Sequence, residues 1–153
     1  MVAPRIVDLI EAHRQRWGDS STQIATFGTI DDEAVANWYE RVCVAALRST
    51  PSRGLFFGAS AGCVAGVELV DGREVVIKAY QPRWRLGALQ AVSAAQQRLS
   101  AAGFACPVPV VPPLEFEGVV ASVDFLLLDP GMRLLDMDEM SDSAASLAQA
   151  ISI

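Results

Sequence analysis

The chain has 153 residues, which is enough for one packed domain or two small subdomains. Hydrophobic residues make up 52% of it and the mean hydropathy is +0.31, a composition that excludes a disordered chain. No run of about 18 apolar residues free of charge and proline is present to span a bilayer. A net charge of −6 and a pI near 4.7 argue against nucleic acid as a partner, because phosphate binding relies on clustered Lys and Arg.

The cysteines and the N-terminal residues predict the compartment. Cys43, Cys63 and Cys106 are odd in number and far apart, so they fit neither a disulfide framework nor a zinc knuckle, and we expect buried thiols in a reducing compartment. Residues 1–11 lack the basic segment and the uninterrupted apolar core of a secretory signal. We therefore expect a cytoplasmic protein with no membrane and no nucleic-acid partner.

The first 53 residues predict two helices. Pro4–Trp17 carries apolar residues and His13 at helical spacing, and His13 is expected to be a packed residue rather than a ligand. Residues 23–27 fit either a short strand or a loop. Asp31 or Asp32 then begins a second helix. Its apolar positions recur at helical spacing and are Val35, Trp38, Tyr39, Val42, Cys43, Ala46 and Leu47.

The centre of the chain predicts a strand, a glycine-rich loop and a hairpin. A first strand is expected at Leu55–Phe57, and the hairpin pairs Val64–Val70 with Arg73–Tyr80. Asp71-Gly72 supplies the two-residue turn, because both positions tolerate positive φ. Side chains alternate across a strand, so Val76 and Lys78 share one face of the second hairpin strand.

The last third predicts a helix followed by two strands. The helix covers Arg85–Ala102 and ends at Gly103 in the left-handed conformation. Residues 104–113 are too rich in proline for a central strand and are expected to form an extended connection. Strands are expected at Glu117–Ala121 and Val123–Leu128, with a turn at 129–131. A further helix begins at Ser141 and reaches Ile153 without an end signal, which favours a piece of a longer protein.

Lys78 is the candidate binding residue. A single cation among apolar residues of a strand is costly to bury without a partner, and a phosphate or a carboxylate is the usual partner. Upstream, Gly58, Gly62 and Gly66 would let backbone N–H groups approach a phosphate closely. The alternative is a surface lysine whose stem packs while its ammonium group reaches water.

Val75-Val76-Ile77-Lys78 resembles the third-strand V-A-I-K motif of the protein-kinase-like fold. The order of lysine strand, helix, Ala-Gly-Phe and Pro-x-Pro resembles its aminoglycoside phosphotransferase and choline-kinase-like branch. The glycine loop departs from the G-x-G-x-x-G pattern, with Ser60 at the second glycine and Cys63 at the third. The resemblance implies that Lys78 pairs with the nucleotide phosphates and that Gly58–Gly62, including Ser60, forms a flap over them. It also implies that Val76 lies against the adenine and that Phe125–Asp129, including Leu127, forms the hinge.

The resemblance implies an α+β fold, with a mostly antiparallel five-stranded sheet and a packed helix preceded by two N-terminal helices. Its domains would be a helical segment at 1–53, the kinase-like N-lobe at 54–129, and a linker at 130–153 leading to an absent catalytic lobe. The expected function is ATP binding, with Mg²⁺ only if that lobe is present, and no phosphotransferase activity of these 153 residues alone. The expected partner is a second copy or the missing lobe. The alternative is a non-catalytic protein-interaction module.

Three further patterns bear on this interpretation. The resembling family pairs its lysine with a helix carboxylate, but no Asp or Glu occurs between Lys78 and Glu115, so the helix offers only Gln90, Gln96 and Gln97. Gly58–Gly62 also satisfies the G-x-S-x-G motif of hydrolases, which needs a downstream histidine, and the only histidine lies upstream. The acidic residues at 136–139 suggest a Mg²⁺ site, but a solvated turn explains them better. The sequence does not identify the phosphate acceptor.

Overall fold

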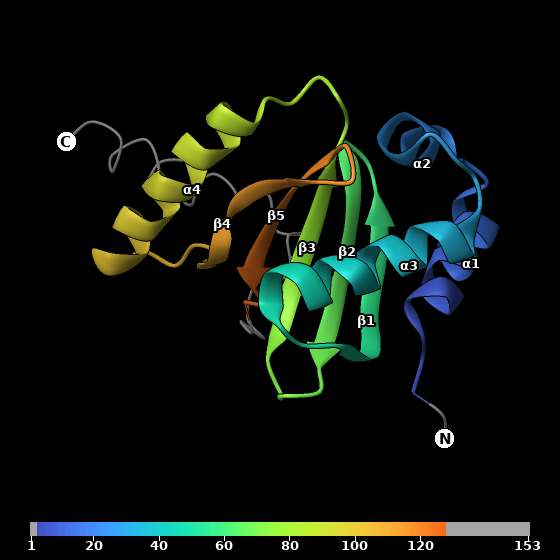
Figure 1. Cartoon of the computed structure of the whole chain (residues 1–153), viewed down its shortest axis with the longest axis horizontal. Coiled ribbons are helices and arrows are strands. Elements are labelled where there is room, and N and C mark those ends of the chain that lie inside the picture. The colour runs from blue at the N-terminus through green and yellow to red at the C-terminus, as the bar shows by residue number, and fades with distance from the viewer. Residues whose placement is uncertain (1–2, 128–153) are drawn as a thin grey trace, which may run out of the picture.

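The computed structural model describes residues 3–127, so the predicted turn at 129–131, the acidic residues at 136–139 and the last helix lie outside the described part. Within it the chain forms one five-stranded antiparallel sheet flanked by helices, which confirms the predicted α+β class (Figure 1). The elements in chain order are α1 (Ile6–Trp17), α2 (Ser21–Phe27), α3 (Asp32–Val42), the π-helix η1 (Cys43–Leu47), β1 (Pro51–Ala59), β2 (Gly62–Leu69), β3 (Glu74–Tyr80), α4 (Leu86–Ala101), β4 (Pro109–Phe116) and β5 (Val119–Phe125).

The N-terminal region has three α-helices rather than two. Residues 21–27 form α2, because the Asp19 carboxylate accepts from the Ser21 N–H at 2.8 Å and Gly28 ends the helix with φ 72°. Asp31 caps α3 as predicted, accepting from the N–H groups of Glu33 and Ala34. The buried Asp32 of α3 links the three helices. Its carboxylate forms an ion pair with Arg14 of α1 at 2.7 Å and accepts a hydrogen bond from the Gln23 amide of α2 at 3.2 Å.

The second predicted helix does not continue regularly to Leu47. After Val42 the chain changes to the π-helix η1, and Arg48 ends it with φ 56°. The following strand β1 begins at Pro51, so it is longer than the predicted Leu55–Phe57 and starts before the predicted domain boundary at 53/54. The boundary therefore falls inside a strand.

The central hairpin is present, but its turn differs from the predicted two-residue turn. Only Gly72 has positive φ, at 85°, whereas Asp71 does not. The Gly72 N–H donates to the Leu69 carbonyl at 2.9 Å and the Leu69 N–H donates to the Arg73 carbonyl at 2.8 Å. This is the pattern of a turn followed by a left-handed glycine, which makes a three-residue loop.

The C-terminal strands are placed differently from the prediction. β4 occupies Pro109–Phe116, and its prolines are tolerated because it is the edge strand of the sheet. Glu117 and Gly118 have φ 50° and 79° and form the turn into β5, rather than beginning a strand. β5 is continuous through Ser122, so the two predicted strands are one.

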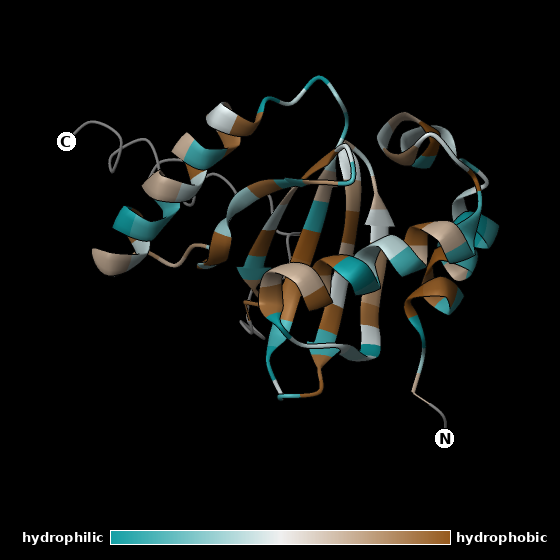
Figure 2. Ribbon diagram, viewed as in Figure 1, coloured by the Kyte–Doolittle hydropathy of each residue, from teal (hydrophilic) through white to brown (hydrophobic). Residues whose placement is uncertain are grey.

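One hydrophobic core joins the N-terminal helices to one face of the sheet. In Figure 1, α3 crosses that face, α1 and α2 lie beyond β1, and α4 flanks β4 at the opposite side. Fully buried side chains from helix and sheet meet in it, including Tyr39 and Val42 from α3 and Val67, Ile77 and Val123 from the strands. In Figure 2 the middle strands are largely brown, whereas teal recurs along the helices and at the turns. Residues 3–53 therefore share the core of the sheet and do not form a separate packing unit.

Candidate functional site

Lys78 lies on the face of β3 opposite this core. Val75, Ile77 and Ala79 are buried against the helices, while Val76, Lys78 and their face-mates are half-buried. The register places Lys78 opposite Val64 of β2 and Ser122 of β5, and places Val76 opposite Asp124. Opposed residues share a face, so Lys78 and Asp124 are diagonal neighbours on adjacent strands.

Lys78 and Asp124 form an ion pair. The ammonium nitrogen lies 3.2 Å from a carboxylate oxygen of Asp124, and the side chains are 32% and 4% exposed. A carboxylate buried to this extent needs a cation or several donors, and Lys78 supplies the cation. Beside the pair, the Tyr80 hydroxyl lies 3.1 Å from the Ser122 hydroxyl, which extends the polar cluster along both strands. Lys78 is also the only lysine in the sequence.

Asp124 was missed because it stands in an apolar run that predicts a buried strand. The helix glutamines do not reach Lys78 in its place. Gln90 and Gln97 are exposed, the Gln90 amide donates to the Pro113 carbonyl, and the Gln96 carbonyl accepts from the Cys106 thiol. The sequence does contain one indication of Asp124, because Val120, Ser122 and Asp124 alternate along the strand and therefore share one face of β5. The strand order was needed to place that face beside Lys78.

A hollow of about 180 Å³ adjoins the ion pair. It is lined by Val76, Lys78, Pro107, Asp124, Phe125, Leu126 and Leu127, so the structure brings together three predicted site residues, Val76, Lys78 and Leu127. Two hinge donors are already used, since the Phe125 N–H donates to the Val108 carbonyl at 2.8 Å and the Leu126 N–H to the Glu74 carbonyl at 2.9 Å. Residues 128 and 129 of the predicted hinge lie outside the described part.

The other predicted site residues do not line this hollow. Gly58 and Ser60 line a hollow of about 650 Å³ beside α1 and α2, and the Ser60 carbonyl accepts from the Thr22 hydroxyl at 3.0 Å. Gly62 lines neither hollow. A Cβ there would overlap the Ala79 carbonyl oxygen, and a Cβ at Gly66 would overlap the Phe56 ring. Both glycines are thus explained by close packing within the sheet.

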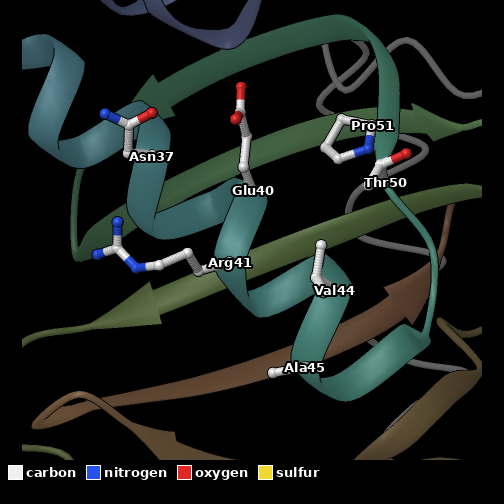
Figure 3. Close-up of a pocket in the computed structure, with 7 residues that line it drawn as sticks. All are labelled: Asn37, Glu40, Arg41, Val44, Ala45, Thr50 and Pro51. Atoms are coloured by element: carbon white, nitrogen blue, oxygen red, sulfur yellow. The ribbon is translucent and has the colours of Figure 1, made fainter.

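A third hollow, of about 410 Å³, lies on the outer side of α3 and η1. It is lined by Asn37, Glu40, Arg41, Val44, Ala45, Thr50 and Pro51 (Figure 3). Arg41 pairs with Glu117 in the β4–β5 turn at 2.7 Å, which raises the pKa of its guanidinium group. This hollow contains none of the predicted site residues.

Comparison of the chain with protein-family models, with curated proteins and with solved structures gave no match. Within residues 3–127, no group of three or more His, Cys, Asp or Glu side chains could hold a metal ion. No helix of this part is long and apolar enough to cross a bilayer.

The thiols and the histidine are structural in this geometry. Burial raises the pKa of Cys43 to about 12 and that of Cys63 to about 11, so both remain protonated and unreactive at neutral pH. Cys106 is half-buried, and all three thiols are free. His13 packs edge-on against Phe57, with ring centroids 5.4 Å apart, as expected for a packed residue.

Proposed function

We propose that the face around Lys78 binds ATP and that the chain is the nucleotide-binding lobe of an aminoglycoside-phosphotransferase-like kinase. The observation that supports this most directly is the Lys78–Asp124 pair at the edge of the hollow formed by Val76 and Phe125–Leu127. The resembling family holds its lysine with a carboxylate. Here β5 supplies that carboxylate in place of the helix.

The residues fit part of a nucleotide. A hollow of about 180 Å³ is smaller than the roughly 300–1,000 Å³ of sites that enclose a whole ligand, so it suits a planar base alone. Val76 and Leu127 would contact the base on its apolar faces. The phosphates would extend across the open sheet face, where the ammonium of Lys78 is accessible. Asp124 restricts the lysine side chain, which reduces the entropy lost on binding.

ATP supplies a transferable phosphoryl group when bound, but transfer also needs a base and Mg²⁺ ligands. The resembling enzymes carry these in a second lobe, where a catalytic H-x-D segment is followed by the metal-binding acid, and this sequence has no H-x-D. We therefore propose nucleotide binding without turnover for the 153-residue chain. A γ-phosphate transfer assay that detected turnover would contradict this part of the proposal.

The single lysine permits a direct test with an acyl-phosphate derivative of ATP. The lysine amine attacks the acyl carbonyl, an amide forms, and the nucleotide leaves, so mass spectrometry reports whether Lys78 lies beside bound phosphates. We expect labelling at Lys78 that excess ATP suppresses, and ATP affinity, measured by calorimetry, that falls about tenfold or more without the lysine.

The variant must leave no buried charge unpaired. Lys78→Met alone would strand the Asp124 carboxylate, so the informative variant is Lys78→Met combined with Asp124→Asn. Arg83→Gln is the matched control, because it removes an exposed cation outside the site. Equal ATP affinity of the double variant and the wild-type chain would overturn the proposal, as would labelling that ATP does not suppress.

The alternative, a non-catalytic interaction module, is supported by apolar side chains around the same face. Phe56 and Leu127 are exposed, and Asp124 already neutralises Lys78. Indifference to ATP together with self-association in light scattering would favour this function. A monomer at high concentration that binds ATP would exclude it.

A further inference from the structure

The outer edge of β1 differs from the opposite edge of the sheet. β4 carries Pro109, Pro112 and Pro113, residues that cannot donate to an added strand. By contrast, residues 55–59 of β1 have the sequence Leu-Phe-Phe-Gly-Ala, with neither charge nor proline. The pairing of β1 with β2 is irregular between Gly54 and Phe56 and regular from Phe56 to Ala59. A regular apolar edge without charge or proline tends to pair with another extended chain.

Part of this edge is already paired with an extended segment of the same chain. The Gly54 N–H donates to the Pro4 carbonyl at 2.8 Å, and Arg5 has the extended backbone angles φ −81° and ψ 161°. Helix α1 then begins at Ile6 and the pairing stops. In the part of the chain that the structure describes, no backbone hydrogen bond joins residues 55–59 to any segment other than β2.

A groove continues along the edge from that point. Two hollows, of about 650 and 300 Å³, share His13, Trp17 and Phe57. Together they are lined by every residue from Leu55 to Ser60. Because successive side chains of a strand point to opposite faces, a groove lined by consecutive residues runs along the strand's edge. Its other wall is α1 and the start of α2, and the larger hollow also reaches Val64 of β2.

The two ends of the groove differ in charge. The narrower end has Leu9, Ala12 and Arg16, and the wider end has Asp19 and Thr22. The Ser21 N–H and hydroxyl hold the pKa of Asp19 below its ordinary value, so this carboxylate stays charged at neutral pH. Trp17 is 64% exposed, and the Arg16 guanidinium carbon lies 5.3 Å from its ring centroid, within the range of a cation–π contact.

We propose that this groove binds an extended, basic segment of a partner polypeptide, which adds to β1 as a sixth strand. Backbone groups of residues 55–59 would bind the partner's backbone, as in other strand-addition complexes. A basic side chain would lie at Asp19 and Trp17, and an apolar side chain at the narrower end. The chain's net charge of −6 favours approach of such a segment. This groove does not include Lys78, although Val64, which lines its larger hollow, lies opposite Lys78 in the sheet, and the proposal does not rest on the proposed function.

The test uses the full 153-residue chain and a phage-displayed library of random heptapeptides. We expect enriched peptides in which Arg or Lys stands among β-branched or aromatic residues. Fluorescence anisotropy with the most enriched peptide then measures affinity. Methylating its backbone nitrogens at alternate positions should weaken binding about tenfold in one register and have little effect in the other, because only one edge of the peptide faces β1.

Variants of the groove complete the test. Asp19→Asn keeps the hydrogen-bond acceptor but removes the charge. It should weaken peptide binding about threefold, which is the effect expected from losing one exposed ion pair. Trp17→Ser should weaken it about tenfold. Glu115→Gln, which removes an exposed carboxylate on β4, is the matched control and should leave affinity unchanged.

Three results would overturn the proposal. The first is a library in which no peptide is enriched over an unrelated immobilised protein. The second is an enriched peptide whose binding changes neither with Trp17→Ser nor with backbone methylation. The third is a dimer of the chain that Trp17→Ser dissociates, which would make a second copy the occupant of the groove.

Discussion

At the scale of single residues, two glycines of the predicted phosphate flap have different surroundings. A Cβ at Gly62 would meet the backbone of β3 at Ala79, whereas a Cβ at Gly58 would meet nothing within 4 Å. Neither residue has positive φ. Gly62 is therefore required by the packing of two strands, while Gly58 is free to carry a side chain.

This difference gives a stability prediction. Gly62→Ala should lower the free energy of unfolding by about 1–3 kcal/mol, because the overlap is with backbone that cannot move aside. Gly58→Ala should be neutral or stabilising by up to about 1 kcal/mol, since alanine loses less conformational entropy than glycine in a strand. Urea denaturation measures both. Equal losses in the two variants would contradict the packing explanation.

Asp124 shows why the candidate site was only partly predictable from single residues. Lys78, Val76 and Leu127 were identified from the lysine strand and the resemblance, and the structure places them around one hollow. The carboxylate that pairs with Lys78 belongs to Asp124 of β5, 46 positions later in the sequence. The strand register brings this carboxylate to 3.2 Å from the lysine ammonium nitrogen. The spacing of residues along the sequence does not tell which residues of two distant strands lie opposite each other.

At the scale of secondary-structure elements, local signals were reliable where a cap or turn residue marks an end. Asp31 begins α3, Gly103 follows α4 with φ 89°, and the β2–β3 hairpin forms around Gly72. The errors occurred where tertiary context decides. β4 keeps its prolines only because it is an edge strand, and Glu117-Gly118 lacks the usual asparagine or aspartate of its turn.

The cap of α3 can be tested directly. Asp31→Ala removes the acceptor for the Glu33 and Ala34 N–H groups and should lower the free energy of unfolding by about 1 kcal/mol. Asp31→Asn keeps an oxygen in the same place and should cost only a few tenths of a kcal/mol. Thermal denaturation followed by circular dichroism compares them. A larger loss for Asn than for Ala would contradict the capping role.

At the scale of the whole molecule, the core contains three weak acids that must stay protonated. Burial raises the pKa of Cys43 to about 12 and of Cys63 to about 11, and raises that of the fully buried Tyr39 as well. In the unfolded chain the thiols titrate near 9, so above that pH the unfolded state has lost protons that the folded state retains. Stability must therefore fall as pH rises.

We expect the contribution of these buried acids to the free energy of unfolding to be constant below about pH 8 and to decrease above about pH 9. Each buried thiol contributes at most about 1.4 kcal/mol per pH unit until its folded-state pKa is reached. Urea titrations at pH 8, 9 and 10 measure the slope. Cys63→Ala should make the slope shallower, even though it lowers stability at every pH. An unchanged slope would show that Cys63 ionises equally in both states.

The sequence by itself determined the central hairpin and the shared face of Val76 and Lys78, because hydrophobic periodicity and turn chemistry are local, and its resemblance to a known fold implied the α+β class. Only the tertiary structure decided which strands are neighbours, and with that the Lys78–Asp124 pair, the two different hollows lined by the glycine loop and by Lys78, and the open edge of β1 beside α1. These depend on contacts between residues far apart in the chain. Their geometry is set by how a shared core packs helices against the sheet.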